Sequence, residues 1–415
     1  MSVIERYSPT GVATTFRRVD WDFANAWTRY GLSLVHWYPT KLTPQVASSL
    51  IAGLTEPGET VCDPFCGSGT VLAEAMRLRR RAVGVDISPV ACLISTARTT
   101  LIPVRDFSAA IRAFLGRLHF GLGILNGSLL PLPITPAEEE ILLLLKSQTS
   151  NPENKPLAHW FHPAVYRDIC FATHCIALEP SPTVRTLLTA AFSSLLRACC
   201  GQSRSWKDAA DNVPPKNPAL KDIYLLCSSR LRSLERGMQI FIEQCTSHGM
   251  SIATSNKLTT VICDDTRHIE SVPRGSVDCI ITSPPCPGVT DHITSQRLSM
   301  LWLGHNPEEL KHTEIGARWK RHRKESLQEY LDDMSRCLIQ IHRLLRDEGR
   351  LAIVIDSSRA RTRQSEATVA LTDFISGELK MERVGSFGRQ TSRLCRLDSS
   401  CTRAQEILIY RKRHG

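Results

Sequence analysis

The segment at residues 61–70, Val-Cys-Asp-Pro-Phe-Cys-Gly-Ser-Gly-Thr, constrains the fold of this chain more than any other stretch. An apolar run leads into its two glycines and a helix-like run, residues 71–78, follows, which predicts a strand, a tight turn and the start of a helix. Gly67 and Gly69 can adopt backbone angles closed to other residues, and they let a ligand approach the main chain closely. The helix that begins next would point unpaired N–H groups at that ligand.

A carboxylate about twenty residues further on narrows the choice of ligand. Residues 81–86 predict a second strand ending in Asp86, which is placed to accept both hydroxyls of a ribose. The loop lacks the Gly-Lys-Ser/Thr ending that binds ATP or GTP, and it lacks the third glycine of the dinucleotide fingerprint. A glycine turn with its own acid, Asp63, better fits a cationic nucleoside without phosphates, such as S-adenosylmethionine. An ordinary strand–helix turn is the alternative.

Composition limits the class of protein and its partners. The 415 residues suffice for two domains, or for one domain with a large insertion. The net charge of +10 suits a polyanionic partner, although a merely basic soluble protein would show the same balance. The 15 cysteines never occur at Cys-x-x-Cys spacing, so we expect reduced thiols and no metal site. We expect no signal segment or membrane span, hence a cytoplasmic protein; the oligomeric state stays open.

Hydrophobic periodicity divides the chain into three parts. An irregular arm at 1–30 is followed by strand–helix alternation up to about residue 102. Residues 103–257 are mainly helical. They are either a structural lid or a region that recognises the target. The sheet pattern resumes over 258–415. We therefore expect an α/β, Rossmann-like doubly wound sheet with a mainly helical insertion. The expected strands are 259–263, 276–282, 350–355 and 406–410, and the expected helices are 45–54 (with Thr43 as cap), 138–145, 184–198, 223–245, 327–345 and 367–379.

The tetrapeptide Ser283-Pro284-Pro285-Cys286 follows an expected buried strand and so lies at the ligand-binding edge of the sheet. Consecutive prolines fix the direction of the Pro284 carbonyl. That carbonyl and the Ser283 hydroxyl offer two acceptors for the two hydrogens of an exocyclic amine, which would turn the nitrogen lone pair toward an electrophilic methyl group. Positioning and preorganised electrostatics would supply the rate. A simple Pro-Pro turn is the alternative.

Together these segments resemble the amino-methyltransferase superfamily, and most closely the DNA methyltransferases that act on cytosine N4 or adenine N6. Residues 63–70 resemble motif I of that family, 83–86 motif II, 263–265 motif III and 282–285 motif IV. Residues 36–41, His-Trp-Tyr-Pro-Thr-Lys, resemble motif X. The resemblance covers about residues 36–100 and 258–412, but not the insertion.

The resemblance implies a role for each matching residue. Asp86 would bind the cofactor ribose, and Asp265, rather than Asp264, would contact the adenine amine. Lys41 and Thr43 would reach the methionine carboxylate. The complete set implied to bind S-adenosylmethionine is Lys41, Thr43, Asp63, Phe65, Gly67, Gly69, Thr70, Asp86 and Asp265. The implied catalytic set is Ser283, Pro284, Pro285 and Cys286.

The sequence departs from the family at Cys286, where most members have an aromatic residue that stacks on the extruded base. A base–aromatic stack contributes about 1–3 kcal/mol, which cysteine cannot supply. Either another ring, Trp302 or Trp37, covers the base, or activity is weak, altered or lost. Residues 311–324, with six Lys or Arg and Trp319, are expected to contact DNA. The arginines at 77–81 are explained by a helix C-terminus, which favours cations.

The function predicted from these patterns is methyl transfer from S-adenosylmethionine to an exocyclic amine of a base flipped out of duplex DNA, without a membrane partner. A serine at the head of motif IV favours cytosine N4 over adenine N6. One alternative is an RNA enzyme that methylates guanine N2. Another is a catalytically degenerate protein that keeps the fold and binds nucleic acid.

Overall fold

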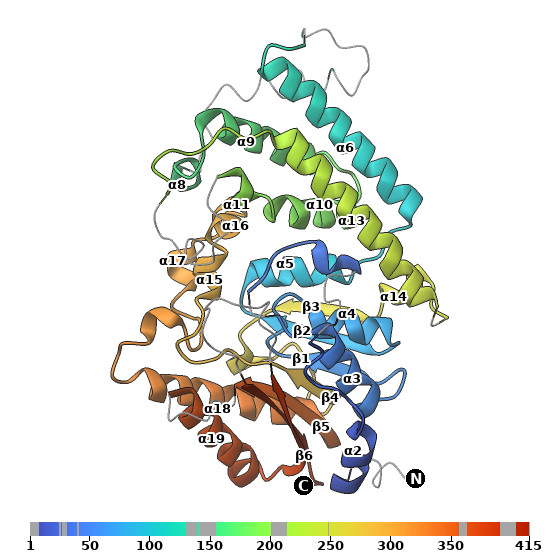
Figure 1. Cartoon of the computed structure of the whole chain (residues 1–415), viewed down its shortest axis with the longest axis vertical. Coiled ribbons are helices and arrows are strands. Elements are labelled where there is room, and N and C mark those ends of the chain that lie inside the picture. The colour runs from blue at the N-terminus through green and yellow to red at the C-terminus, as the bar shows by residue number, and fades with distance from the viewer. Residues whose placement is uncertain are drawn as a thin grey trace.

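A seven-stranded sheet in the order β3-β2-β1-β4-β5-β7-β6 forms the centre of the computed structural model (Figure 1). The structure describes residues 8–24, 26, 31–39, 41–129, 139, 141, 155–200, 214–247, 249–356, 363–390 and 404–414. All neighbouring strands are parallel except β7, which is antiparallel to β5 and β6. The strands are β1 Thr60–Asp63, β2 Arg81–Asp86, β3 Thr259–Cys263, β4 Val277–Thr282, β5 Leu345–Asp356, β6 Glu382–Gln390 and β7 Ala404–Arg411. The expected α/β class with a mostly parallel sheet is confirmed.

The strand order reverses between β1 and β4, and this places the site. From β1 the chain first builds outward through β2 to β3, and then it returns to the other side of β1 to begin β4. In open α/β sheets a crevice forms where the order reverses, beyond the carboxyl ends of the strands. Both the glycine segment after β1 and the Ser-Pro-Pro-Cys segment after β4 leave the sheet at that point.

Alternating side chains give the sheet two apolar faces. In β1, Val61 packs with helices on one face and Cys62 with helices on the other, as the two-residue period of a strand requires. The first face is covered by α2 Pro9–Phe16, α3 Pro44–Leu54 and α4 Thr70–Arg77. The second face is covered by α18 Ser326–Leu344 and α19 Arg363–Asp373.

The helices that connect β2 to β3 pack together above α5 Pro89–Arg98 (Figure 1). They join α5 in one apolar cluster. Helix α13 Ile223–Thr246 approaches the 3₁₀ turn Gly31–Leu34 so closely that a Cβ at Gly237 would lie 2.5 Å from the Gly31 carbonyl oxygen. The division of the chain at residues 102 and 257 stays a prediction. These helices are α6 Val104–Leu125, α8 Lys155–Ala158, α9 Pro163–Ala177, α10 Pro182–Ser193, α11 Leu196–Cys199, α13 Ile223–Thr246 and α14 Ile252–Ser255.

Several local expectations differ from the structure. The arm at 1–30 contains a helix, α2, whose first turn is capped by the Ser8 hydroxyl. Strand β5 begins at Leu345, directly after α18 and before the expected start at Arg350. Its pairing with β4 is irregular between Leu345 and Arg350, where Glu348 has a left-handed φ of 61°. The expected helix 184–198 is two helices, and most of 138–145 lies outside the described residues.

Three short helices follow the Ser-Pro-Pro-Cys segment, α15 His292–Ser295, α16 Arg297–Trp302 and α17 Pro307–Leu310. They lead back toward the insertion, where the Ser193 hydroxyl of α10 donates a hydrogen bond of 2.7 Å to the Ser299 hydroxyl of α16. In the described part of the chain, no helix combines the length and the apolar character needed to cross a bilayer.

Candidate functional site

The glycine turn has the geometry expected from its sequence. Gly67 and Gly69 have φ values of +50° and +71°, which favour glycine, and Gly69 is the N-cap of α4. A Cβ at Gly69 would lie 2.9 Å from the Cα of Ser95, so no larger residue fits there. The buried Arg98 holds the turn by donating to the Ser68 carbonyl oxygen (3.2 Å) and the Thr70 hydroxyl (2.9 Å).

Asp86 joins the end of β2 to this turn. One carboxylate oxygen accepts the Gly67 N–H at 2.8 Å, and the other accepts the Ser88 N–H at 2.9 Å. Each carboxylate oxygen has a second lone pair. Asp86 can therefore still accept the hydroxyls of a ribose after both backbone bonds have formed.

Two buried acids, Asp63 and Glu314, lie near the half-buried Asp86, and none of the three has a counter-cation among the described residues. Burial raises the pKa of Asp86 to about 6, of Asp63 to about 7 and of Glu314 to about 8, and the charge of Asp86 contributes to the latter two shifts. Among the described residues, no ion pair involves any of the three. Glu314 accepts the backbone N–H groups of His292 (2.5 Å) and Ile293 (3.4 Å). This arrangement suits a ligand that carries positive charge.

One hydrogen bond links the two segments that the sequence singled out. The Thr282 hydroxyl, at the end of β4, donates to the carboxylate of Asp63, at the end of β1, over 2.7 Å. In the register of the two strands, Cys62 pairs with Ile280. The glycine turn and the Ser-Pro-Pro-Cys segment therefore share one edge of the sheet.

The Ser283 side chain keeps its acceptor capacity. Its hydroxyl donates a 3.1 Å hydrogen bond to the Val354 carbonyl oxygen of β5. Because the hydroxyl hydrogen is used in this way, the oxygen lone pairs are left to accept hydrogen bonds. Cys286, half-buried, has its sulfur 4.0 Å from the Pro284 carbonyl oxygen.

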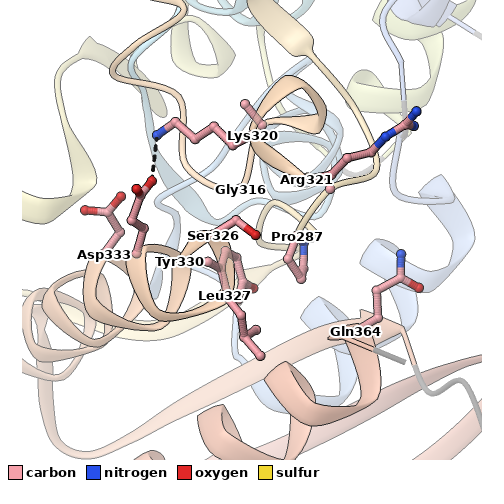
Figure 2. A pocket seen from close by; sticks show the side chains of 12 residues that line it. Pro287, Gly316, Lys320, Arg321, Ser326, Leu327, Tyr330, Asp333 and Gln364 are labelled. Carbon is pink, nitrogen blue, oxygen red and sulfur yellow. Dashed lines mark ion pairs between the residues drawn. The ribbon is translucent and has the colours of Figure 1, made fainter. Parts of the chain in front are cut away.

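A cavity of about 270 Å³ opens beside this segment, between the loop after Cys286 and the N-terminal ends of α18 and α19 (Figure 2). Tyr330 lies in its wall and donates a 3.1 Å hydrogen bond to the Pro285 carbonyl oxygen. This cavity is therefore on the side of the prolines, and no residue of the glycine turn lines it. Its lining comprises Pro287, Gly288, Gly316, Ala317, Lys320, Arg321, Ser326, Leu327, Glu329, Tyr330, Asp333 and Gln364.

Comparison with known proteins agrees with this geometry. A family model described as DNA methylase matches residues 16–97. The chain is 20% identical over 387 residues to type II methyltransferase M.MjaII of Methanocaldococcus jannaschii, covering 78% of this chain and 72% of that protein. It is 25% identical over 299 residues to type II methyltransferase M.MvaI of Kocuria varians, covering 68% of this chain and 59% of that protein. These similarities support an amino-methyltransferase family for this chain.

A shorter sequence match and a structural match support the family assignment less than the two long sequence matches do. Type II methyltransferase M.EcaI of Enterobacter cloacae is 40% identical over 55 residues, which cover 13% of this methyltransferase and 12% of that protein. The 1.5 Å structure of the rRNA methyltransferase aviRa from Streptomyces viridochromogenes aligns over 96% of this chain and 95% of its own, at 9% identity and a TM-score of 0.32. A likeness that weak carries no inference.

The two tryptophans considered as substitutes for an aromatic residue at position 286 both contact the insertion of the methyltransferase. Trp302 donates to the Thr173 hydroxyl at 2.8 Å and packs on Phe192. The guanidinium of Arg197 lies 5.2 Å from the centre of the Trp37 ring. Neither tryptophan lines the cavity, whereas Tyr330 does; the sequence analysis missed Tyr330 because it is 44 positions beyond Cys286 on an amphipathic helix.

Asp265 is strongly bound within the protein. Its carboxylate pairs with Arg267 at 2.6 Å, and Arg267 in turn pairs with Asp333 at 2.8 Å. Burial alone would raise the pKa of Asp265, but the hydrogen bonds and charge of Arg267 outweigh it and the pKa is lowered. Asp264 lies nearer to Asp86, because its N–H donates to the Asp86 carbonyl oxygen at 3.1 Å.

The remaining predicted cofactor residues lie around the start of α3 and the glycine turn. The Lys41 ammonium donates to the His36 carbonyl oxygen at 3.0 Å. Thr43 occupies the N-cap of α3, yet its hydroxyl accepts from Arg389 at 3.1 Å and makes no capping bond. The Phe65 N–H donates to Asp63 at 3.1 Å. Within the described residues no group of His, Cys, Asp or Glu could hold a metal ion.

Tyr38 is a second residue that the sequence analysis did not single out. A Cβ at Gly67 would lie 3.0 Å from its ring, so Tyr38 packs directly on the glycine turn. Burial and the charge of Asp86 raise the pKa of the phenol well above its usual value. The His36–Lys41 segment therefore reaches the turn through an aromatic ring as well as through its polar residues.

Proposed function

We propose that this methyltransferase transfers a methyl group from S-adenosylmethionine to an exocyclic base amine in DNA, cytosine N4 before adenine N6. The matched family model is described as DNA methylase, and the relatives M.MjaII and M.MvaI are type II methyltransferases. The observation that carries the proposal is the 2.7 Å hydrogen bond between Thr282 and Asp63. It joins the turn that would hold the methyl donor to the prolines that would hold the acceptor.

The residues around the glycine turn fit this cofactor. Asp86 would accept the ribose hydroxyls with its second lone pairs, and the N–H groups opening α4 face the same place. The uncompensated carboxylates of Asp63 and Glu314 would favour the cofactor's positive charge over a neutral or anionic ligand. When bound, the cofactor supplies an electrophilic methyl group on a sulfonium. Lys41, Thr43, Phe65, Thr70 and Asp265 remain proposed contacts.

Ser283 and the Pro284 carbonyl would hold the two hydrogens of the target amine. The hydroxyl oxygen is free to accept because its hydrogen is donated to Val354, and Tyr330 restrains the adjoining Pro285. Two acceptors in fixed positions align the nitrogen lone pair with the methyl group before the reaction, so positioning supplies most of the rate. A serine at this position favours cytosine N4.

The acceptor base would reach this clamp by leaving the double helix. Flipping costs a few kcal/mol, which contacts at the destination must offset. The cavity beside Pro287 and Tyr330, at about 270 Å³, is close to the lower end of the roughly 300–1,000 Å³ range of ligand pockets, and therefore suits a small planar group. Tyr330 offers an aromatic ring near the position where Cys286 has none.

The test is a methyl-transfer assay with labelled S-adenosylmethionine, followed by digestion of the acceptor to nucleosides. The purified protein would be incubated separately with duplex DNA of random sequence, single-stranded DNA and tRNA. We expect label in N4-methylcytosine from duplex DNA. Label in N6-methyladenine would overturn only the choice of base, whereas label confined to guanine of tRNA, or no label in any acceptor, would overturn the proposal.

A further inference from the structure

The residues 311–324, called here the basic segment, form one wall of the cavity beside the prolines. The Gly288 N–H donates to the Gly316 carbonyl oxygen at 2.8 Å, and the Arg318 N–H donates to the Thr290 carbonyl oxygen at 3.3 Å. These bonds fasten the segment to the loop that follows Cys286. Lys320 and Arg321 also line the cavity, and the Lys320 ammonium is directed to its ion-pair partner Glu329 (Figure 2).

Charge is strongly unbalanced along this segment. The six cations are Lys311, Arg318, Lys320, Arg321, Arg323 and Lys324. Its own acid, Glu314, is buried and faces the other way, toward the N-terminal end of α15. Two neighbouring acids compensate part of this charge: Glu308 pairs with Lys311, and Glu329 lies 3.8 Å from Lys320 and 3.9 Å from Arg323.

Trp319 holds several of these cations together. Its backbone N–H donates to Asp291 at 3.0 Å, which anchors the residue next to α15. Arg323, Lys320 and Lys311 lie 4.6, 5.7 and 5.9 Å from the centre of its ring. Each cation–π contact contributes about 0.5–1 kcal/mol at an exposed site and thus offsets part of the repulsion between neighbouring charges.

Two exposed cations remain without an acidic partner. In the described part of the chain, neither Arg318 nor Lys324 makes an ion pair or a side-chain hydrogen bond, although each is next in sequence to a member of the Trp319 cluster. Surplus positive charge fixed at the rim of a cavity attracts a polyanion and concentrates it there. The guanidinium of an arginine also binds the oxygens of a phosphate in bidentate geometry.

We propose that the basic segment binds the phosphates of duplex nucleic acid on either side of the flipped base, and that Arg318 and Lys324 make two of these contacts. This inference rests on the proposed function, because it places the target nucleotide in the cavity that the segment borders. The phosphates next to a flipped nucleotide must pass close to this cavity. Arg318 and Lys324 are exposed in the same segment whose Lys320 and Arg321 line it.

The test compares two double variants that lose the same charge. Arg318→Ala/Lys324→Ala removes the proposed contacts, and Arg274→Ala/Arg413→Ala removes two exposed cations at the opposite edge of the sheet. That location follows from the strands: Arg274 precedes β4, and Arg413 follows the end of β7, where Arg411 pairs with Arg350. Binding to a fluorescent duplex would be measured by anisotropy at several KCl concentrations, with thermal unfolding confirming that both variants fold.

Loss of two phosphate contacts reduces the slope of log K against log salt by about 1.8, at roughly 0.9 per contact. We expect this decrease for Arg318→Ala/Lys324→Ala and an unchanged slope for Arg274→Ala/Arg413→Ala. We also expect a higher KM for DNA in the first variant, with kcat and cofactor affinity unchanged, because the two residues would touch phosphates and not the reacting amine.

Each other outcome decides against the inference. An unchanged slope in the first variant, or an equal decrease in both, would show that the segment has no special role, and the proposed function would stand if the wild-type protein still methylates duplex DNA. A wild-type protein that neither binds nor methylates duplex DNA would overturn both. A protein that binds tRNA with this slope change and not duplex DNA would assign the surface to RNA.

Discussion

The two sides of the candidate site have opposite electrostatic character. Around the glycine turn lie the buried carboxylates of Asp63 and Glu314 and the half-buried carboxylate of Asp86. Their pKa values are raised because desolvation disfavours their charge, and among the described residues no cation pairs with them. Beside the prolines, the basic segment carries more cations than its neighbouring acids can pair with. The donor side thus suits a positively charged ligand, and the acceptor side suits a polyanion.

This difference teaches how one sheet edge can hold two unlike substrates. The Thr282–Asp63 hydrogen bond connects the sides, yet the charged groups of each side are directed to a separate partner. A sulfonium would offset the unpaired negative charge of the donor side, and phosphates would offset the unpaired positive charge of the acceptor side. Variants on the two sides should therefore separate cofactor binding from methyl transfer.

Ser283→Ala should give the largest effect and act only on the acceptor side. Removing one preorganised hydrogen-bonding group from a reacting centre lowers kcat by about 10²–10³-fold in comparable sites. We expect that loss in single-turnover methyl transfer, with the cofactor dissociation constant unchanged by calorimetry. Ser276→Ala is the matched control, because its hydroxyl donates to the Pro273 carbonyl oxygen at the other end of β4. Normal turnover by Ser283→Ala would remove the assigned role.

Asp86→Asn should act on the donor side instead. Hydrogen bonds to a charged group contribute about 1.5–3 kcal/mol, so the cofactor should bind roughly 10- to 100-fold more weakly. Titration calorimetry would measure this. Asp332→Asn, an exposed acid on α18, is the control for loss of one negative charge. Equal affinities for both variants would contradict the ribose assignment and the proposed contrast between the sides.

The donor side could be predicted from sequence because its parts are local. The turn and Asp86 are about twenty residues apart and belong to one strand–helix–strand unit, so their spacing alone predicts that they meet. The parallel sheet and the carboxyl-edge position of Ser283 followed from alternating strands and helices, and the structure agrees with them.

The acceptor side and Glu314 depend on contacts that no local pattern encodes. Tyr330 meets Pro285, and Glu314 meets His292, only because the loop after β4 folds back over α18. In sequence, Tyr330 is one apolar position of an amphipathic helix, which is explained by packing alone. Strand β6 was missed for a similar reason: it is an edge strand, and among the described strands it pairs with β7 alone. Its two-residue alternation of buried and exposed positions is irregular.

Tyr330→Phe tests one hydrogen bond of the acceptor side without changing the shape of the cavity. The substitution removes the 3.1 Å hydrogen bond to the Pro285 carbonyl oxygen and keeps the ring that lines the cavity. The net worth of such a bond is about 0.5–1.5 kcal/mol, so kcat should decrease by a few-fold to about tenfold, while cofactor affinity stays the same. Tyr330→Ala should cost more if the ring also contacts the base. A Phe variant as impaired as the Ala variant would show that the ring itself adds nothing.

The smallest effect is a pH dependence of stability that belongs to the donor side. Raised pKa values mean that the folded protein holds protons that the unfolded chain has already lost, so these acids make the cofactor-free protein less stable as pH rises. His36 and His292, with pKa values lowered to about 3 and about 4, act in the opposite direction, but mainly below the unfolded value of 6.5. Between pH 7 and 8 the acids dominate, chiefly Glu314 with a pKa of about 8.

Over that interval we expect a loss of roughly 1 kcal/mol, which would lower the thermal midpoint by about 2 °C or less. Glu314→Gln should remove most of the decrease, because the glutamine carbonyl still accepts the His292 N–H and carries no charge. S-adenosylmethionine should stabilise the protein more at pH 8 than at pH 7, since its positive charge meets carboxylates that are then ionised. Stabilisation by the cofactor that is independent of pH would mean that these acids do not face the sulfonium. The donor side would then not be adapted to a positively charged ligand, which contradicts the proposed contrast between the two sides.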